Sequence, residues 1–412
     1  GVDIQPIAVQ ISKLRFFISL VVDQKPTNDA VHNFGIRPLP NLESKFVAAN
    51  TLIPVDYDAS LFESTDAIIS LKEQLKELNH KIFLAKRNID KQRLKSKIKE
   101  TRKALAKAIE ETGFVKPGAA QQLADWDMFE QNTHVAFFDA EWMFGVKEGF
   151  DIVIGNPPYI SAPSQIAEKK LSEQRERIIK SKKYKSLYQK WDLYIPFIEI
   201  GTQLNCTNGI TTMIVPFPLT NQLYAKVLRM IIVKETNLIE LADLNGTKVF
   251  ENATVSNCIP FIVKSTSKGI TWISKVSEKL QLYRAFLQSH SDLVQDEKTF
   301  VWNVTQEKRE TNRHAEMNVL GDFCYISKGM VLNSDENSID VKFKKADLIT
   351  DSKDMVHCRM FIEGKDCGKY SVSRIRYLEY DTNRVPNKLS RPTFRELYTT
   401  PKLMFNRLGE LQ

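Results

Sequence analysis

The feature that most constrains this chain is an apolar segment that stops at a pair of prolines. Residues 150–155 read Phe-Asp-Ile-Val-Ile-Gly and run directly into Asn156-Pro157-Pro158-Tyr159. The apolar run predicts a β-strand, and proline cannot donate to a β-ladder, so the strand must end in a turn here. Because proline fixes φ at about −65° and has no N–H, the turn should be stiff and its carbonyls should remain free.

A turn of this kind suits an exocyclic amine. The Asn156 side-chain oxygen and the Pro157 carbonyl would accept the two hydrogens of a nucleobase NH2 group, and Tyr159 offers a flat face for the ring. The alternative is an ordinary strand followed by a Pro-Pro turn. The apolar strand in front of the motif favours the functional interpretation.

The composition is compatible with a globular protein that binds a polyanion. A length of 412 residues with 42% hydrophobic content allows two or three domains. The five cysteines show no Cys-x-x-Cys pairing, so neither a disulfide framework nor a metal site is predicted. The sequence has neither an apolar run of membrane-spanning length nor a signal peptide, so we expect a cytoplasmic protein without a membrane partner.

Positive charge gathers in three segments. Residues 80–107 carry eleven Lys/Arg against two acids, residues 165–190 carry nine against three, and residues 374–407 carry eight against three. For the first segment a solvated helix face explains the charge equally well. The second follows the Asn156 turn and the third is interleaved with aromatic residues, so both favour contacts with DNA.

The order of predicted elements indicates an α/β domain with a helical insertion. After strand 151–155, helices around 192–205 and 221–235 alternate with strands 210–215, 238–243 and 254–264, which predicts a mainly parallel sheet. Residues 66–112 contain no Pro or Gly and keep helical spacing. We expect them to form an antiparallel hairpin that projects from the core.

Taken together, these segments resemble the γ-class adenine-N6 DNA methyltransferases, especially the methyltransferase region of fused type IIG (also called IIS) restriction-modification enzymes. The similarity covers roughly residues 1–270. It implies that Asn156, Pro157 and Tyr159 are catalytic and grip a flipped adenine. It also implies that Phe250, which follows Val249 before a strand, faces Tyr159 across the target base.

The resemblance further implies S-adenosylmethionine as the cofactor. Asp3 would bind the ribose hydroxyls and Ile4 would pack on the cofactor's adenine, while Asn50 stands where many relatives have Asp. Phe197 would border the same adenine, although a core aromatic on an amphipathic helix explains it equally well. The family's glycine-rich turn does not occur in this sequence. We therefore expect a fragment that lacks the first strand of the sheet and has an incomplete cofactor site.

The implied fold is a Rossmann-like S-adenosylmethionine-dependent methyltransferase sheet with a helical-hairpin insertion and a C-terminal mixed α/β target-recognition domain. We assign residues 1–65 and 129–270 to the two parts of the methyltransferase domain and residues 66–128 to the insertion. Residues 271–315 are expected to be a linker, and residues 316–412 a truncated target-recognition domain.

The leading hypothesis is site-specific adenine-N6 methylation of double-stranded DNA within a prokaryotic type II restriction-modification system, with the base flipped out of the duplex. A catalytically incomplete DNA-recognition fragment and a phage-defence methyltransferase without a nuclease remain open, while RNA and protein substrates are less favoured. A nuclease with its Mg²⁺ is expected outside this chain, because Glu43-Ser44-Lys45 is the single acid-x-Lys triplet worth considering and falls in the cofactor-binding part. The sequence does not predict an oligomeric state.

Overall fold

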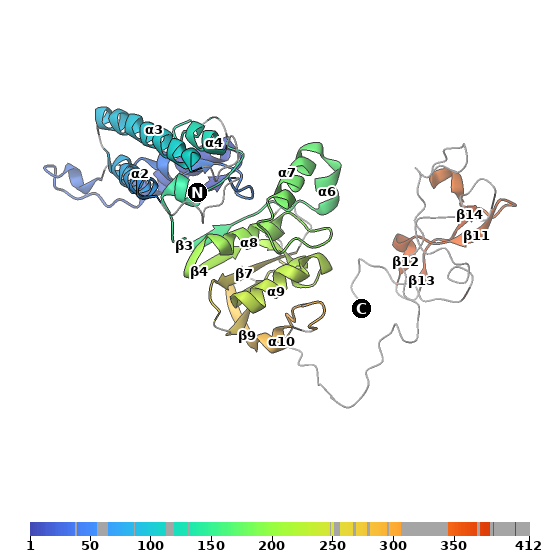
Figure 1. Ribbon diagram of the computed structural model, residues 1–412. Coiled ribbons are helices and arrows are strands. Elements are labelled where there is room, and N and C mark those ends of the chain that lie inside the picture. Colours follow the sequence, from blue (N-terminus) through green and yellow to red (C-terminus); the bar gives the residue numbers. More distant parts are fainter. Residues whose placement is uncertain are drawn as a thin grey trace. The chain divides into compact units, whose positions relative to one another are not determined.

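The computed structural model describes two compact units of the chain, Gly1–Glu307 and Lys308–Gln412 (Figure 1). Described in the first unit are residues 1–305 apart from 38, 56–64, 86, 113–118, 131, 133, 248, 251–255, 267–268, 278–280 and 295. Described in the second unit are residues 345–382 apart from 369–370 and 380–381, and residue 400.

Strands and helices alternate along the first unit (Figure 1). Its strands are β1 (Val2–Asp3), β2 (Val47–Ala48), β3 (Phe150–Gly155), β4 (Asn205–Met213), β5 (Val215–Pro216), β6 (Asn237–Asp243), β7 (Asn257–Val263), β8 (Ile270–Val276) and β9 (Leu282–Ser289). Its helices are α1 (Pro6–Val22), α2 (Asp66–Leu84), α3 (Asn88–Glu111), α4 (Ala119–Asp125), α5 (Ala140–Phe144), α6 (Ala162–Ala167), α7 (Lys169–Lys180), α8 (Tyr194–Leu204), α9 (Lys226–Glu235) and α10 (His290–Leu293).

The larger sheet of this unit has seven strands in the order β3-β4-β7-β6-β8-β9, with β5 paired to β7. The β3–β4 and β6–β8 pairs are parallel, whereas β7 is antiparallel to β4, β5 and β6, and β9 is antiparallel to β8. The α/β architecture is therefore confirmed, but the expected mainly parallel order is wrong. The reason is that β7 returns beside β6 as a hairpin and enters the sheet between β4 and β6, so every pairing it makes is antiparallel.

The segment expected to be a linker, residues 271–315, instead begins inside this sheet. Thr271 and Ser274 of β8 are both fully buried. Their hydroxyls donate to the Leu238 carbonyl at 2.7 Å and to the Glu240 carboxylate at 2.6 Å, both on the neighbouring β6. Small polar residues made the segment look like a connection, but a buried hydroxyl with a partner costs little and is compatible with a central strand.

The main hydrophobic core lies between this sheet and the helices that pack on it. Tyr194, Ile195 and Ile198 of α8 are fully buried, and Ile232 of α9 joins the same cluster. These helices are apolar on the face toward the sheet, which is the pattern of a helix that covers a β-layer. Among the described residues, no helix has the length and apolar character needed to span a membrane.

A second core lies between the two-stranded parallel sheet β1–β2 and the helices α2 and α3. The two helices form the predicted hairpin, with α2 ending at Leu84 and α3 beginning at Asn88. Leu75 and Leu105 pack in one cluster with Val47 of β2. The hairpin thus packs its apolar stripe on the small sheet, and its buried residues belong to this cluster and not to the core of the seven-stranded sheet.

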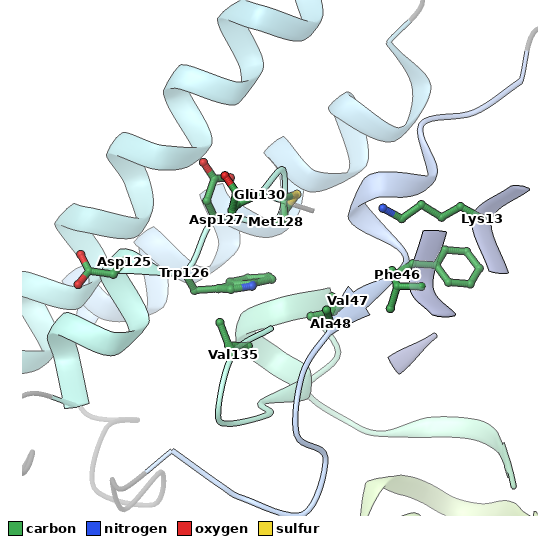
Figure 2. Close-up of a pocket in the computed structure, with 11 residues that line it drawn as sticks. Lys13, Phe46, Val47, Ala48, Asp125, Trp126, Asp127, Met128, Glu130 and Val135 are labelled. Carbon is green, nitrogen blue, oxygen red and sulfur yellow. The ribbon is translucent and has the colours of Figure 1, made fainter. Parts of the chain in front are cut away.

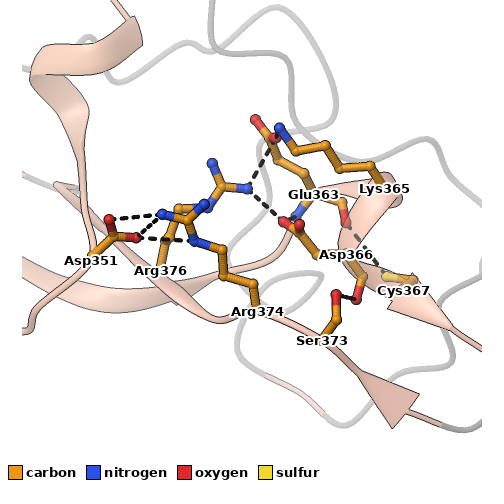
Figure 3. A network of polar contacts seen from close by, with 8 residues as sticks. All are labelled: Asp351, Glu363, Lys365, Asp366, Cys367, Ser373, Arg374 and Arg376. Carbon is orange, nitrogen blue, oxygen red and sulfur yellow. Dashed lines mark hydrogen bonds and ion pairs between the residues drawn. The ribbon is translucent and has the colours of Figure 1, made fainter.

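The second unit contains a three-stranded antiparallel sheet in the order β10-β14-β11 and the separate hairpin β12–β13. These strands are β10 (Ile349–Thr350), β11 (His357–Phe361), β12 (Cys367–Gly368), β13 (Ser371–Val372) and β14 (Arg376–Glu379). Figure 3 shows a polar network of this unit, in which Arg376 of β14 pairs with Glu363 and Asp366. The sequence also predicts a strand at residues 402–405, and these residues lie outside the described part of the chain.

Candidate functional site

The Asn156-Pro157-Pro158-Tyr159 turn directly follows β3, as the sequence predicted. Its entry is fixed because the Gly155 carbonyl accepts a hydrogen bond from the Ile214 amide at 3.2 Å. Pro157 is buried, whereas the Asn156 side chain is exposed. No described residue donates to the Asn156 amide oxygen or to the Pro157 carbonyl. Both acceptors of the turn are therefore available to a ligand.

Two hydrogen bonds hold the hydroxyl of the Tyr159 side chain. Its hydroxyl donates to the Ile214 carbonyl at 3.1 Å and accepts from Asn257 Nδ2 at 2.9 Å. Burial, followed by the nearby Cys258 thiol, raises the pKa of Tyr159 to about 12. The phenol thus stays neutral and acts as a fixed strut rather than as a base.

The Tyr159 ring contacts Phe250, the residue expected on the other side of the target base. The ring centroids are 6.3 Å apart and the planes meet at 77°, an edge-to-face contact. The two aromatic residues therefore meet at the acceptor turn although they are far apart in sequence. A base could not lie between the rings in this arrangement, so stacking of a base requires Phe250 to move aside.

Asp192 anchors the chain that leaves this turn. Its carboxylate accepts from the Ala162 amide at 3.0 Å and from the Tyr224 hydroxyl at 2.8 Å. Beside it, the Leu193 amide donates to the Ile160 carbonyl at 3.0 Å. Burial raises the pKa of Asp192 above its ordinary value. We did not predict a role for Asp192, although it begins the very segment that suggested Phe197.

Part of the basic segment after the turn is used for packing. The Arg175 guanidinium lies 3.7 Å from the centre of the Trp191 ring, and its Nη1 donates to Gln165 at 2.9 Å and to the Trp191 carbonyl at 3.0 Å. Lys169 and Lys170 at the start of α7 are exposed. These two lysines, unlike Arg175, are therefore open to solvent.

Three of the four predicted cofactor residues lie together, at the carboxyl ends of β1 and β2. The strands are parallel and pair Asp3 with Ala48, so Asp3 and Asn50 leave the sheet at the same edge. Asp3 is exposed, with one carboxylate oxygen accepting from the Gln5 amide at 2.8 Å, and Ile4 is 42% exposed. The other Asp3 oxygen and the Ile4 side chain fit a ribose diol and an adenine face.

Asn50 and Phe197 fit a cofactor less well. Asn50 is only 8% exposed, and its Oδ1 accepts from the Leu52 amide at 3.2 Å, so the side chain holds its own turn. That turn is tied to the main core, because the Tyr184 hydroxyl donates to the Leu52 carbonyl at 2.8 Å. Phe197 lies on α8 and packs, half-buried, against the same core, as the alternative interpretation of this residue expected.

A small cavity of about 70 Å³ lies beside β2 and has Val47 and Ala48 of this strand in its lining. Figure 2 shows Lys13 and Phe46 on one side of it and Trp126 on the other. Lys13 is 6% exposed, and desolvation lowers its pKa. The neighbouring Glu43-Ser44-Lys45 triplet is used in packing, since Ser44 is buried and the Lys45 ammonium lies 5.0 Å from the centre of the Phe83 ring.

The sequence profile of the Eco57I restriction-modification methylase family matches residues 1–250 of the chain. The chain belongs to this family. The matched range includes β1, β2, the acceptor turn after β3 and Phe250, which are the elements described above. The interpretation of this sequence as the methyltransferase region of a restriction-modification system is thereby confirmed.

Individual relatives of the family match shorter parts of the chain. It is 27% identical over 164 residues to the type II methyltransferase M.BstVI of Geobacillus stearothermophilus, covering 40% of this chain and 27% of that protein. It is 32% identical over 125 residues to the type II restriction enzyme and methyltransferase RM.Eco57I of Escherichia coli, covering 30% of this chain and 12% of that protein. The chain thus spans well under half of the length of these relatives.

Among solved structures, the chain is similar to the methyltransferase subunit of a type I restriction-modification system from Streptococcus thermophilus. The TM-score is 0.29 and the identity 15%, over 45% of this chain and 44% of that chain.

Proposed function

We propose that this chain carries the adenine-N6 methyl-transfer site of an S-adenosylmethionine-dependent DNA methyltransferase in a type II restriction-modification system. One observation supports this most strongly. The Asn156 amide oxygen and the Pro157 carbonyl follow β3 as two acceptors that no described residue engages, next to the Tyr159–Phe250 pair. Two fixed acceptors beside aromatic rings suit the NH2 group of a flipped base.

The two acceptors activate the amine by hydrogen bonding. When both N–H bonds point at Asn156 and Pro157, the nitrogen shifts toward sp³ character and its lone pair becomes free for in-line attack. S-adenosylmethionine would supply the electrophilic methyl group, with Asp3 and Ile4 holding its ribose and adenine. As the N–C bond forms, the methyl–sulfur bond would break to leave S-adenosylhomocysteine, and the methylated amine would release one proton to solvent. No covalent enzyme intermediate is required. The two hydrogen bonds of the Tyr159 hydroxyl hold the end of this side chain, two residues after the acceptors.

Extrusion of the base is offset in part by stacking. Each aromatic contact with a base contributes about 1–3 kcal/mol, against a cost of a few kcal/mol for unpairing and unstacking. Tyr159 is already fixed for this role, while Phe250 contacts it and would swing away to admit the base. The exposed Lys169 and Lys170 would neutralise phosphates beside the extruded nucleotide.

The relative RM.Eco57I is named as both a restriction enzyme and a methyltransferase. We extend this to the present protein as a proposal: the methyltransferase region described here would be joined to a nuclease that uses Mg²⁺ and lies outside this chain. A methyltransferase without a nuclease is equally compatible with the acceptor turn, because methyl transfer needs none of the nuclease residues.

Transfer of a labelled methyl group tests the proposal. The full-length protein is incubated with plasmid DNA and tritiated S-adenosylmethionine, and the digested nucleosides are separated. We expect label in N6-methyladenine, and we expect Asn156→Ala to lower transfer at least about 100-fold because an acceptor used only at the reacting amine is lost. Asn88→Ala, at an exposed asparagine at the start of α3, is the matched control and should leave transfer unchanged.

Duplex affinity separates chemistry from binding. Asn156→Ala should bind plasmid DNA as tightly as the wild type, since the side chain acts on the extruded base and not on the duplex. Label in N4-methylcytosine would contradict the choice of base. Full activity of Asn156→Ala would overturn the assignment of the turn.

A further inference from the structure

A second polar cavity lies between α3 and the segment that follows α4, apart from the acceptor turn. Its volume is about 230 Å³. The α3 side contributes Lys95, Lys99, Arg102 and Lys103, and the other side contributes residues 124–127 and 129. The cavity is thus lined by four cations against the two carboxylates of Asp125 and Asp127.

Arg102 in the wall of this cavity is buried without a counter-ion. It is only 2% exposed, and its guanidinium lies 4.0 Å from the centre of the Trp126 ring. Nη1 donates to the Trp126 carbonyl at 3.3 Å, but Nε and Nη2 have no partner among the described residues. Desolvation lowers the pKa of Arg102 to about 9, and the charge of Asp127 offsets this only in part.

The two unpartnered nitrogens are the ones that matter for recognition. Nε and Nη2 form one edge of the guanidinium, and this edge donates two parallel hydrogen bonds to a phosphate or a carboxylate. A buried donor without an acceptor costs about 1–3 kcal/mol, and more when it is charged. An anion in the cavity would remove this cost.

The charges around Arg102 favour a phosphate over a singly charged anion. Lys99 and Lys103, one helical turn apart on α3, are exposed and make no ion pair with any described residue. Lys95 lies 4.3 Å from the centre of the Phe129 ring, which fixes its direction. The carboxylates are partly used within their own segment, because Asp125 accepts from Gln121 at 2.6 Å and Asp127 from the Phe129 amide at 2.9 Å.

We propose that this cavity is a phosphate-binding site in which the buried Arg102 binds the anion inside the cavity and the exposed Lys99 and Lys103 bind it at the opening. The phosphate is either one in a DNA backbone or a free one, and the chemistry of recognition is the same. The site does not depend on the methyl transfer proposed above, since it shares no residue with the acceptor turn. With this site, the basic residues of α3 bind a specific anion, whereas the alternative in the sequence analysis was a helix face that only contacts solvent.

Calorimetry with inorganic phosphate tests the site in the full-length protein. We expect the wild type to bind phosphate, Lys99→Ala/Lys103→Ala to bind it at least tenfold more weakly, and Arg102→Met not to bind it. Lys97→Ala is the matched control, because Lys97 is exposed on the same helix but does not line the cavity. If Arg102→Met does not fold, Lys99→Ala/Lys103→Ala still tests the site, because Lys99 and Lys103 are both exposed and their replacement leaves the core intact.

A duplex titration over a range of salt concentrations identifies the source of the phosphate. Each lost phosphate contact lowers the slope of log K against log salt by about 0.9. A smaller slope for Lys99→Ala/Lys103→Ala than for Lys97→Ala, together with the loss of phosphate binding, assigns the site to the DNA backbone. Loss of phosphate binding with equal slopes assigns it to a free phosphate. Absence of phosphate binding by the wild type, or equal weakening by Lys97→Ala, would overturn the proposal, whatever the outcome of the methylation assay.

Discussion

Removal of the Tyr159 hydroxyl separates the two roles of this residue. Tyr159→Phe keeps the ring that stacks on a base but deletes the hydroxyl that bonds to Ile214 and Asn257. Each such hydrogen bond contributes about 1 kcal/mol net, so the variant should lose about 2 kcal/mol of unfolding free energy. The loss should not be much larger, because Asn257 Nδ2 keeps the Val215 carbonyl at 3.5 Å as a second acceptor.

A double-mutant cycle in urea measures this. Asn257→Ala removes one of the two bonds and leaves the bond to Ile214 intact, so the coupling between Tyr159→Phe and Asn257→Ala should be about 1 kcal/mol. Methyl transfer by Tyr159→Phe should stay close to that of the wild type, while Tyr159→Leu should lower it about 5- to 150-fold through lost stacking. An uncoupled pair, or an inactive Tyr159→Phe of normal stability, would refute the view that the hydroxyl is a strut.

The same residue predicts a pH dependence. The folded-state pKa of Tyr159 is raised from 10 to about 12, so the folded state favours the neutral phenol. Its stabilising contribution is complete below pH 10 and is lost as the pH rises toward the folded value. The stability difference between wild type and Tyr159→Phe should therefore narrow as the pH rises from about 10 to about 12.

Two further pairs of variants test the supports of the described units. Asp192→Ala should lower the free energy of unfolding by about 2–4 kcal/mol and reduce methyl transfer, without changing phosphate binding. Asp192→Asn keeps an acceptor and removes a desolvated charge, so it should be as stable as the wild type. Arg376→Met removes the ion pairs with the poorly exposed Glu363 and Asp366, of which Glu363 keeps Lys365 as a partner. It should cost about 3 kcal/mol, seen as faster hydrogen exchange in β14. Arg374→Met, whose pair with Asp351 is exposed, should cost at most about 1 kcal/mol.

The local part of the site could be predicted from the sequence. An apolar strand followed by two prolines fixes where β3 ends and which acceptors are left free. The contact of Tyr159 with Phe250 was expected from the family resemblance alone, because no periodicity relates residues so far apart. Asn50 shows the limit of assigning a role by family resemblance. The resemblance suggested that Asn50 contacts the cofactor, but its burial and its hydrogen bond from the Leu52 amide show that the side chain stabilises a turn.

Strand direction and domain limits were harder to predict, because they depend on partners. The apolar pattern of β7 is the same whether its neighbours are parallel or antiparallel, and only its position between β4 and β6 decides. Thr271 and Ser274 have the polarity of a linker, and their burial becomes possible through acceptors that β6 supplies. The sequence of each segment alone does not show which strands will lie beside it.

Charge counts overstate the surface available to DNA, and the arginines show why. A guanidinium can satisfy its donors within the protein, and three arginines from the three basic segments do so to different degrees. Arg175 bonds to carbonyls and stacks on Trp191, and Arg376 lies between Glu363 and Asp366 (Figure 3).

Arg102 is the incomplete case, because its buried Nε and Nη2 have no partner among the described residues. A lysine ammonium on a flexible stem is less often buried in this way. The salt dependence of DNA binding should therefore follow the exposed lysines, together with Arg102 where the α3 cavity takes a backbone phosphate, and should fall well short of the number of basic residues in the three segments.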